Sequence, residues 1–300
     1  MLQPPGFRQS EVSTALGTMV YYSSAEIPSL PDPTQPGYRP PLVFLHGFGG
    51  GSSAYEWSLV YPAFVPEYAV FAPDLVGWGR SEHLSRSYQI QDYLASIGDF
   101  LEQVCTTPAI VIASSLTAAF TVRVAVTRPH LFKGLVLVAP SGLADFDQTY
   151  SNFFAQLVST PLLNRLVYST AIATSFGIRN FLENRQFARA SRVSQEMVDA
   201  YLASAQQPNA DYSAISFVRG DLCFDLAAYM PQITVPTTVL WGKQSQFTSA
   251  ELGQRLVELN PQMIKRFTVL EDCGLTPQLE LPAVTVGWIY DCLKLLVPVR

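Results

Sequence analysis

The chain has 300 residues, with 19 Lys and Arg against 24 Asp and Glu, which gives a formal charge of −5. Such a balance supplies no basic field for a nucleic-acid backbone, so nucleic-acid binding is excluded as a first hypothesis. A hydrophobic content of 48% excludes disorder and is enough for a large core. Charged residues make up only 14%, against about a quarter in ordinary soluble domains, so we expect part of the surface to be apolar or neutral.

The four cysteines are far apart in the sequence and include no C-x-x-C pair. They are Cys105, Cys223, Cys273 and Cys292. This spacing predicts neither a zinc site nor a disulfide framework, and it favours a reducing compartment.

The first twelve residues contain two prolines, Arg8 and Glu11, and lack the apolar centre of a secretory signal. The uncharged run Gln103 to Val122 is as long as a membrane span, but Pro108 and several Ser and Thr residues interrupt it. We therefore expect this run to form a strand, a turn and a helix. The interpretation is a cytoplasmic protein, with membrane association left open.

The first half of the chain alternates short apolar strands with helical stretches. Strands are predicted over 13–22, 42–47, 68–74, 109–114 and 133–140, with a loop over 25–41 that contains six prolines. Continuous apolar strands that alternate with helices indicate a parallel sheet covered on both faces. The predicted fold class is α/β.

Residues 143–229 break this alternation, because they show helical periodicity without a strand. The sheet pattern then returns, with a strand over 234–242, a helix over 250–259, a strand over 264–272 and a closing helix over 283–296. The chain is thus predicted to have an α/β core in two pieces, 1–142 and 230–300, with a helical cap, or lid, inserted over 143–229.

Three motifs together resemble one family, the α/β-hydrolase fold. FLHGFGG at 44–50 resembles its oxyanion loop, APDLVGWGRS at 72–81 its Gly-rich turn, and IASSLTAAF at 112–120 its nucleophile elbow. With VPTTVLWG and the final strand and helix, the resemblance covers the chain from about residue 13 to 296. It implies a mostly parallel central sheet and the branch with a helical cap after the sixth strand.

The resemblance places Ser115 at the nucleophile elbow. The backbone there is strained, so residues two positions away must be small. Ala113 meets this need, whereas Thr117 replaces the usual glycine and crowds the turn. The N–H groups of Phe48 and Leu116 would form the oxyanion hole. The alternative is that Ser115 only caps the following helix.

The same resemblance implies that the catalytic triad is incomplete. A serine hydroxyl needs a base within hydrogen-bond reach and an acid that orients this base. The family's acid generally follows the strand-seven Trp-Gly by three residues, and that position holds Ser245. The family's histidine generally follows the glycine after the last strand, and that position holds Leu275.

The chain offers few substitutes for the missing base. Of its three histidines, His46 is expected to have a structural role in the oxyanion loop and His130 to end a helix. His83 follows the Gly-rich turn and is a weak candidate. Asp272, at the end of the last strand, is another weak candidate, since its pKa is about 4 unless it is buried.

Other polar residues near the strand ends are weaker candidates. Asp145 and Asp147 lie where some family members place the acid, but an acid without a histidine has no base to orient. Glu271 is read as a solvated strand end, and Cys273 is expected to pack as a small hydrophobe.

The cap region is poor in charge. Between Gln148 and Ile178 the only charged residue is Arg165, and four Phe and Tyr residues precede Ala171. This composition predicts either an apolar pocket wall, a surface for peripheral membrane contact, or the cap's own core. Four arginines follow and suit either anionic lipid or a solvated face; they are Arg179, Arg185, Arg189 and Arg192.

Two functions remain after this reading, and neither requires a metal or cofactor. The favoured one is a degenerate family member that binds an apolar small molecule or a protein partner with little hydrolysis, because loss of triad members lowers the rate by orders of magnitude. The alternative is a serine hydrolase of lipid-like esters that uses Ser115 with help from water, Asp272 or His83.

Overall fold

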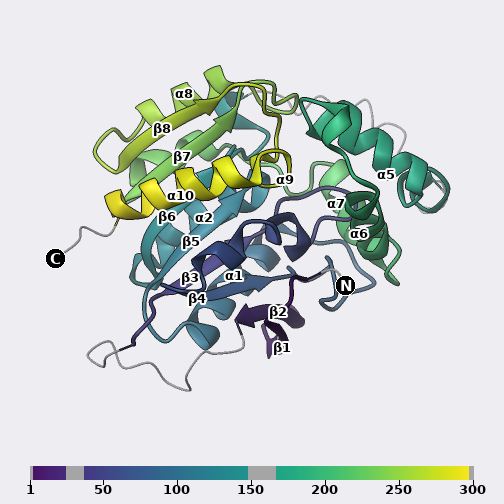
Figure 1. The fold of residues 1–300 in the computed structure, drawn as a ribbon, viewed down its shortest axis with the longest axis horizontal. Helices are drawn as coiled ribbons and strands as arrows, with labels where there is room; N and C mark the ends of the chain where they lie inside the picture. Colours follow the sequence, from purple (N-terminus) through teal and green to yellow (C-terminus); the bar gives the residue numbers. More distant parts are fainter. Residues whose placement is uncertain (1–2, 25–36, 148–166, 297–300) are drawn as a thin grey trace.

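A computed structural model describes residues 3–24, 37–147 and 167–296 (Figure 1). Eight strands form one sheet in the order β1-β2-β4-β3-β5-β6-β7-β8. β1 and β2 are antiparallel to their neighbours, and the remaining pairs are parallel. The strands are β1 (Phe7–Ser13), β2 (Thr18–Ser24), β3 (Pro41–Leu45), β4 (Ala69–Pro73), β5 (Ala109–Ser114), β6 (Phe132–Val138), β7 (Thr237–Gly242) and β8 (Ile264–Leu270).

The N-terminal segment differs from the prediction of one strand over 13–22. It forms a hairpin of β1 and β2, because a turn at residues 14–17 reverses the chain. The Thr14 hydroxyl donates to the Gly17 carbonyl at 2.7 Å and closes this turn. The other predicted strands are present, with ends that differ by at most three residues.

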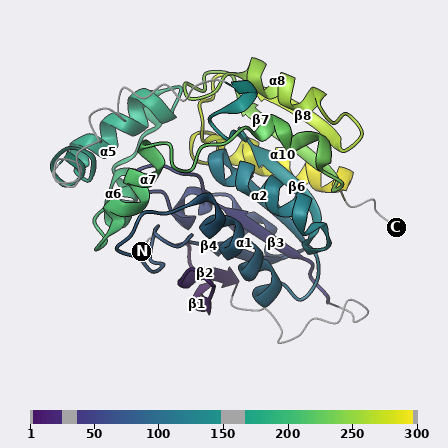
Figure 2. The same cartoon turned by 180° about the vertical axis from the view of Figure 1, so that it is seen from behind.

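Helices cover both faces of the sheet, which explains why its strands are continuously apolar (Figures 1 and 2). On one face Val43 and Val111 pack with three helices, and on the other Leu42 and Ile110 pack with one long helix and two short ones. The first set is α1 (Ile90–Val104), α2 (Ser115–Thr127) and α8 (Ala250–Glu258). The second is α10 (Pro282–Leu296), η1 (Ala54–Trp57) and η2 (Tyr61–Phe64).

The described residues of the predicted cap are 143–147 and 167–229, and the second range lies at one end of the sheet (Figure 1). It is helical and has a core of its own that includes Tyr168, Leu182, Val198 and Tyr201. Its main elements are η5 (Tyr168–Ile172), α5 (Ser175–Phe181), η6 (Leu182–Gln186), η7 (Ala190–Arg192), α6 (Gln195–Ala205) and α7 (Ala210–Val218). The predictions for Arg165 and the aromatic residues before it fall on 148–166, outside the described residues.

The uncharged run 103–122 is divided between the end of α1, the strand β5 and the start of α2, as expected from its interruptions. Within the described ranges, the structure contains no helix with the length and apolar character of a membrane span. The four cysteines are free thiols.

Candidate active site

Ser115 lies at a sharp turn between β5 and α2. Its φ of 55° falls in the left-handed region, which costs a non-glycine residue about 1–3 kcal/mol. Ala113 and Thr117, two positions to either side, are fully buried. The threonine therefore fits at this turn, but its buried hydroxyl has no hydrogen-bond partner in the described structure. The strained backbone presents Ser115 at the carboxyl end of β5.

Two backbone N–H groups beside Ser115 are unused. Those of Phe48 and Leu116 donate to no other described residue, and the latter lies in the first turn of α2, where N–H groups lack helical partners. The Phe48 ring packs against Trp78 and Tyr93, with ring centroids 4.9 Å apart in each pair. This packing holds the loop that carries the Phe48 N–H.

Leu275 lines the same two cavities as Ser115 and is only 8% exposed. Ser245 lies in the adjacent loop, and its buried hydroxyl has no partner in the described structure. The two loops are joined by hydrogen bonds between Gln244 and Cys273 of 2.9 and 3.0 Å. Among the described residues, no imidazole or carboxylate hydrogen-bonds to the Ser115 hydroxyl. A leucine therefore lies beside the serine.

His46 is buried and holds the turn after β4. Its Nδ1 lies 2.7 Å from the Gly47 carbonyl, and its Nε2 accepts from the Leu75 N–H at 3.0 Å. Burial lowers its pKa to about 4, so the ring is neutral at pH 7. His83 pairs through Nε2 with the Gly79 carbonyl, and neither cavity at Ser115 includes it. His130 is exposed in a short turn.

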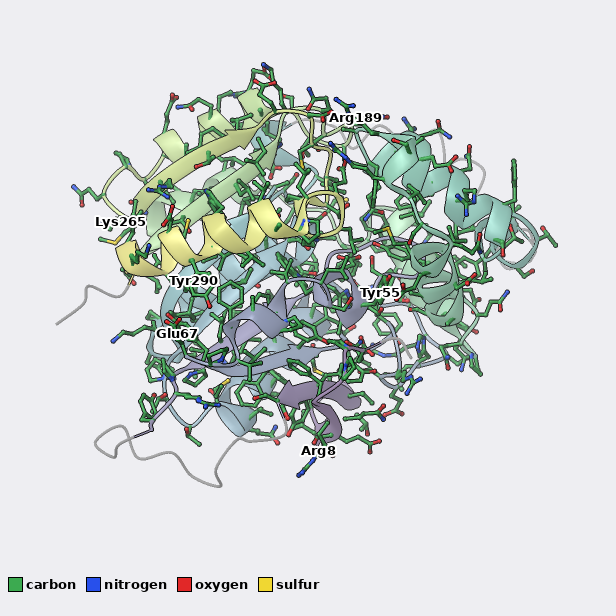
Figure 3. The ribbon with its side chains drawn as sticks, in the orientation of Figure 1. Arg8, Tyr55, Glu67, Arg189, Lys265 and Tyr290 are labelled. Carbon is green, nitrogen blue, oxygen red and sulfur yellow. The ribbon has the colours of Figure 1, made fainter. Side chains whose placement is uncertain are left out.

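The Asp272 carboxylate forms ion pairs with two arginines of the cap. It accepts from Arg189 at 2.6 Å and from Arg192 at 2.7 Å, and these guanidinium groups hold its pKa below the usual range. Arg192 also donates to the Asp272 carbonyl and contacts Glu280 at 3.3 Å. Figure 3 shows Arg189 where the cap meets the core. The structure thus pairs Asp272 with cap arginines.

The remaining strand-end candidates also have local partners. Asp145 accepts from the Ser141 hydroxyl at 2.5 Å and from the Leu226 N–H at 2.8 Å, which closes the loop after β6. Glu271 pairs with Lys243 at 2.5 Å. Burial raises the pKa of the Cys273 thiol to about 12, so it packs as a neutral group.

Glu56, in η1, is a buried carboxyl group that the sequence reading missed. Its Oε2 accepts from the Gly47 N–H at 2.8 Å, and its Oε1 accepts from the Tyr201 hydroxyl of α6 at 3.1 Å. Burial raises its pKa, opposed by hydrogen bonds from Ser52, Gly47 and Tyr201. The only signal in the sequence was a charged residue between the aromatic residues of AYEW.

Two small cavities meet at Ser115, each with a volume of about 10 Å³, which is near the room that one water molecule needs. The first is mostly apolar, and we call it the apolar cavity; its walls include Phe48, Leu143, Phe217, Phe247 and Leu275. The second we call the polar cavity; its walls include Ser52, Glu56, Ser114, Gln186 and Thr276. Each cavity therefore has room for about one water molecule.

The cap is fastened to the loops of the site on two sides. On one side, the Leu275 N–H donates to the Gln186 carbonyl at 2.8 Å. On the other, the Ser204 hydroxyl of α6 donates to the Ser52 carbonyl at 3.1 Å. Gly51 approaches α6 so closely that a Cβ atom would lie 2.2 Å from the Tyr201 carbonyl oxygen. These contacts join the cap to both loops that flank Ser115.

A family model described as alpha/beta hydrolase fold matches residues 40–282. The chain belongs to the α/β-hydrolase family. Its capped sheet with the order described above is the architecture that the motifs implied.

The similar proteins are distant in sequence. Epoxide hydrolase 4 of Mus musculus is 24% identical over 271 residues, which are 85% of this chain and 73% of that protein. The uncharacterized hydrolase YugF of Bacillus subtilis (strain 168) is 26% identical over 286 residues, 94% of this chain and 96% of that protein. Among solved structures, the epoxide hydrolase CorEH has a TM-score of 0.76 at 17% identity and covers 97% of this chain and 100% of its own. A serine hydrolase of carbazole degradation has a TM-score of 0.73 at 17% identity, with 96% and 99% covered.

Proposed function

We propose that this α/β-hydrolase family member has a degenerate triad and binds an apolar small molecule or a protein partner, with little ester hydrolysis. The observation that carries the proposal is Leu275 beside Ser115, in the cavities where a base would be needed. Without a base, the serine hydroxyl remains a weak nucleophile, and removal of triad members costs several orders of magnitude in rate.

The expected ligand is apolar because Phe48, Phe217, Phe247 and Leu275 surround the apolar cavity. The closed cavity is too small for it, so binding requires the cap to move from the Leu275 loop. A fatty acid or isoprenoid that binds the folded form should raise the melting temperature. Stabilisation by polar metabolites alone would contradict the proposal.

Hydrolysis is tested with short p-nitrophenyl esters and with a fluorophosphonate probe of serine nucleophiles. We expect very slow turnover and slow labelling relative to a complete-triad enzyme, and Ser115→Ala provides the background. Rapid stoichiometric labelling that disappears in Ser115→Ala would refute the degenerate reading.

We also propose a cytoplasmic location with peripheral membrane contact through the cap. Phe176 of α5 is 81% exposed, and Arg185 is exposed near it in the chain. Cosedimentation with anionic vesicles, lost in Phe176→Ser, is the expected result. Equal cosedimentation of both proteins would contradict the contact.

A second candidate is a serine hydrolase of lipid-like esters. It is favoured by the φ of 55° at Ser115 and by the free N–H groups of Phe48 and Leu116, which are retained despite the altered triad positions. Strained backbone of this kind persists when the surrounding structure maintains it. Related proteins are named hydrolases. This function requires another base near Ser115.

A further inference from the structure

The polar cavity contains buried polar groups that lack partners. Ser114 and Thr276 are 1% and 3% exposed, and neither hydroxyl has a hydrogen-bond partner in the described structure. Buried hydroxyl groups are costly to leave unpaired, and ordered water commonly satisfies them. The cavity has the volume of about one water molecule and has polar walls. Both features indicate a bound water beside Ser115.

Glu56 is close to the serine across this cavity. A Cβ atom placed on Gly47 would lie 3.4 Å from Glu56 Oε2 and 3.5 Å from Ser115 Cβ. The same point is 3.3 Å from the Ser114 hydroxyl. All three side chains approach the same point, and Glu56, Ser114 and Ser115 line the same water-sized cavity, so a water molecule held there would lie between the carboxyl group and the serine.

We propose that Glu56 is the general base for Ser115 and acts through a water molecule in the polar cavity. The proposal rests on the second candidate function and supplies the base that this function lacks. It gives the protein slow hydrolysis of carboxylic esters, in agreement with the little turnover expected above.

The reaction is balanced as two acyl transfers. First, Ser115 Oγ bonds to the ester carbonyl carbon while its proton passes through the water to Glu56; the bond to the leaving alcohol then breaks, and Glu56 returns the proton to that oxygen. Second, a water attacks the acyl carbon and gives a proton to Glu56, which delivers it to Ser115 Oγ as the acyl bond breaks. The products are a carboxylic acid and an alcohol, and the N–H groups of Phe48 and Leu116 hold the oxyanion in both steps.

The surroundings of Glu56 suit this role. It faces the Tyr201 hydroxyl, which in turn accepts from Gln186 at 2.9 Å, so Tyr201 positions the carboxyl group. The nearby His46 is neutral, and no cation pairs with Glu56 in the described ranges. Because burial raises the pKa of Glu56, the carboxylate is a stronger base than an exposed one.

The experiment measures fluorophosphonate labelling and p-nitrophenyl butyrate hydrolysis from pH 4 to pH 9. We expect the wild type to react slowly and Ser115→Ala not at all. Glu56→Gln keeps the size and an acceptor oxygen, yet should react at least tenfold more slowly, since a general base contributes about 10²- to 10⁴-fold. The matched control is Glu280→Gln, which changes a buried carboxyl group that accepts from the Gly274 N–H and lines neither cavity; it should react like the wild type.

The pH profile of the wild type gives a second readout that needs no variant. We expect a sigmoidal rise set by one ionisation above the usual pKa of glutamate, and the rise should be absent in Glu56→Gln. A rate that only increases in proportion to hydroxide would overturn the proposal. Equal rates for Glu56→Gln and the wild type would also overturn it. No Ser115-dependent labelling in the wild type would overturn it too, while leaving the binding function supported.

Discussion

If Ser245 and Leu275 keep ester hydrolysis slow, as proposed above, an acid and a histidine at these two positions should increase it. The change is Leu275→His with Ser245→Asp, in combination with Thr117→Gly. Leu275 shares both cavities with Ser115, so an imidazole in its place lies near the serine hydroxyl. The loop that carries Ser245 is hydrogen-bonded to the loop that carries Leu275, so an aspartate there can orient the imidazole.

The burial of the substituted residues sets the expected change in stability of each variant. Replacing the buried Leu275 removes about 1.5–3 kcal/mol of apolar burial. Ser245→Asp alone buries a carboxylate without a cation and should be the least stable single variant, and the histidine should recover part of this loss. Thr117→Gly removes a buried hydroxyl that has no partner in the described structure. It also places a glycine in α2, and glycine destabilises a helix by about 1 kcal/mol relative to alanine. A positioned base adds about 10²- to 10⁴-fold in rate.

The assay is hydrolysis of p-nitrophenyl butyrate by the two single, the double and the triple variants, with Ser115→Ala introduced into each. We expect the singles to stay near the wild-type rate, because a histidine without its acid adopts the wrong tautomer and an acid alone orients nothing. The double or the triple variant should gain Ser115-dependent turnover. A folded triple variant with no such gain would show that the pocket itself has changed.

Three further outcomes follow from the contacts around the site. Gly51→Ala should destabilise the protein by about 1–3 kcal/mol in urea unfolding, because its φ is 97° and the new Cβ would clash with the Tyr201 carbonyl; an unchanged midpoint contradicts this close approach. Asp272→Asn should lower the melting temperature at pH 7. Ion pairs with Arg189 and Arg192 depress the pKa of Asp272, so its contribution to folding stability is present above the unfolded pKa of about 4 and is lost as the pH falls through the folded pKa. The melting temperatures of the wild type and Asp272→Asn should therefore converge in acid. Burial raises the pKa of Glu56, so the contribution of this group to folding stability is present below about pH 4 and is lost as the pH rises through the folded pKa. Glu56→Gln should therefore gain stability relative to the wild type towards neutral pH. A stability difference between the two proteins that is constant with pH would contradict this.

Much of the fold follows from local patterns in the sequence. The strand β5 was predicted with its observed bounds, because its residues are continuously apolar and run directly into a helix. The hairpin of β1 and β2 was missed, because the Thr14 side chain closes a turn inside a segment that alternates like one strand. Periodicity reports burial well and turn chemistry poorly.

The candidate site was only partly predictable for a related reason. The positions of Ser115, Ser245 and Leu275 follow from motifs, since each lies at a fixed distance from the end of a strand. Glu56 has no such motif, and its proximity to Ser115 depends on how the loop after β3 folds back into η1. The partners of Asp272 lie about 80 residues away in the chain, so no local pattern could reveal that this carboxylate is held by the cap.

The loop after β8 carries Leu275, at the position where the family's histidine is expected, and also contacts the cap. In a triad enzyme this loop must leave an imidazole free to face the serine. Here Asp272 pairs with Arg189 and Arg192, and the Leu275 N–H donates to the Gln186 carbonyl, so the backbone and carboxylate of the loop are engaged by the cap. An apolar side chain at 275 fits this arrangement, because it lines the apolar cavity together with Phe48, Phe217 and Phe247. A leucine at 275 and the attachment of the cap are therefore consistent with each other, and the base proposed above, Glu56, lines the polar cavity together with Leu275 and Ser115.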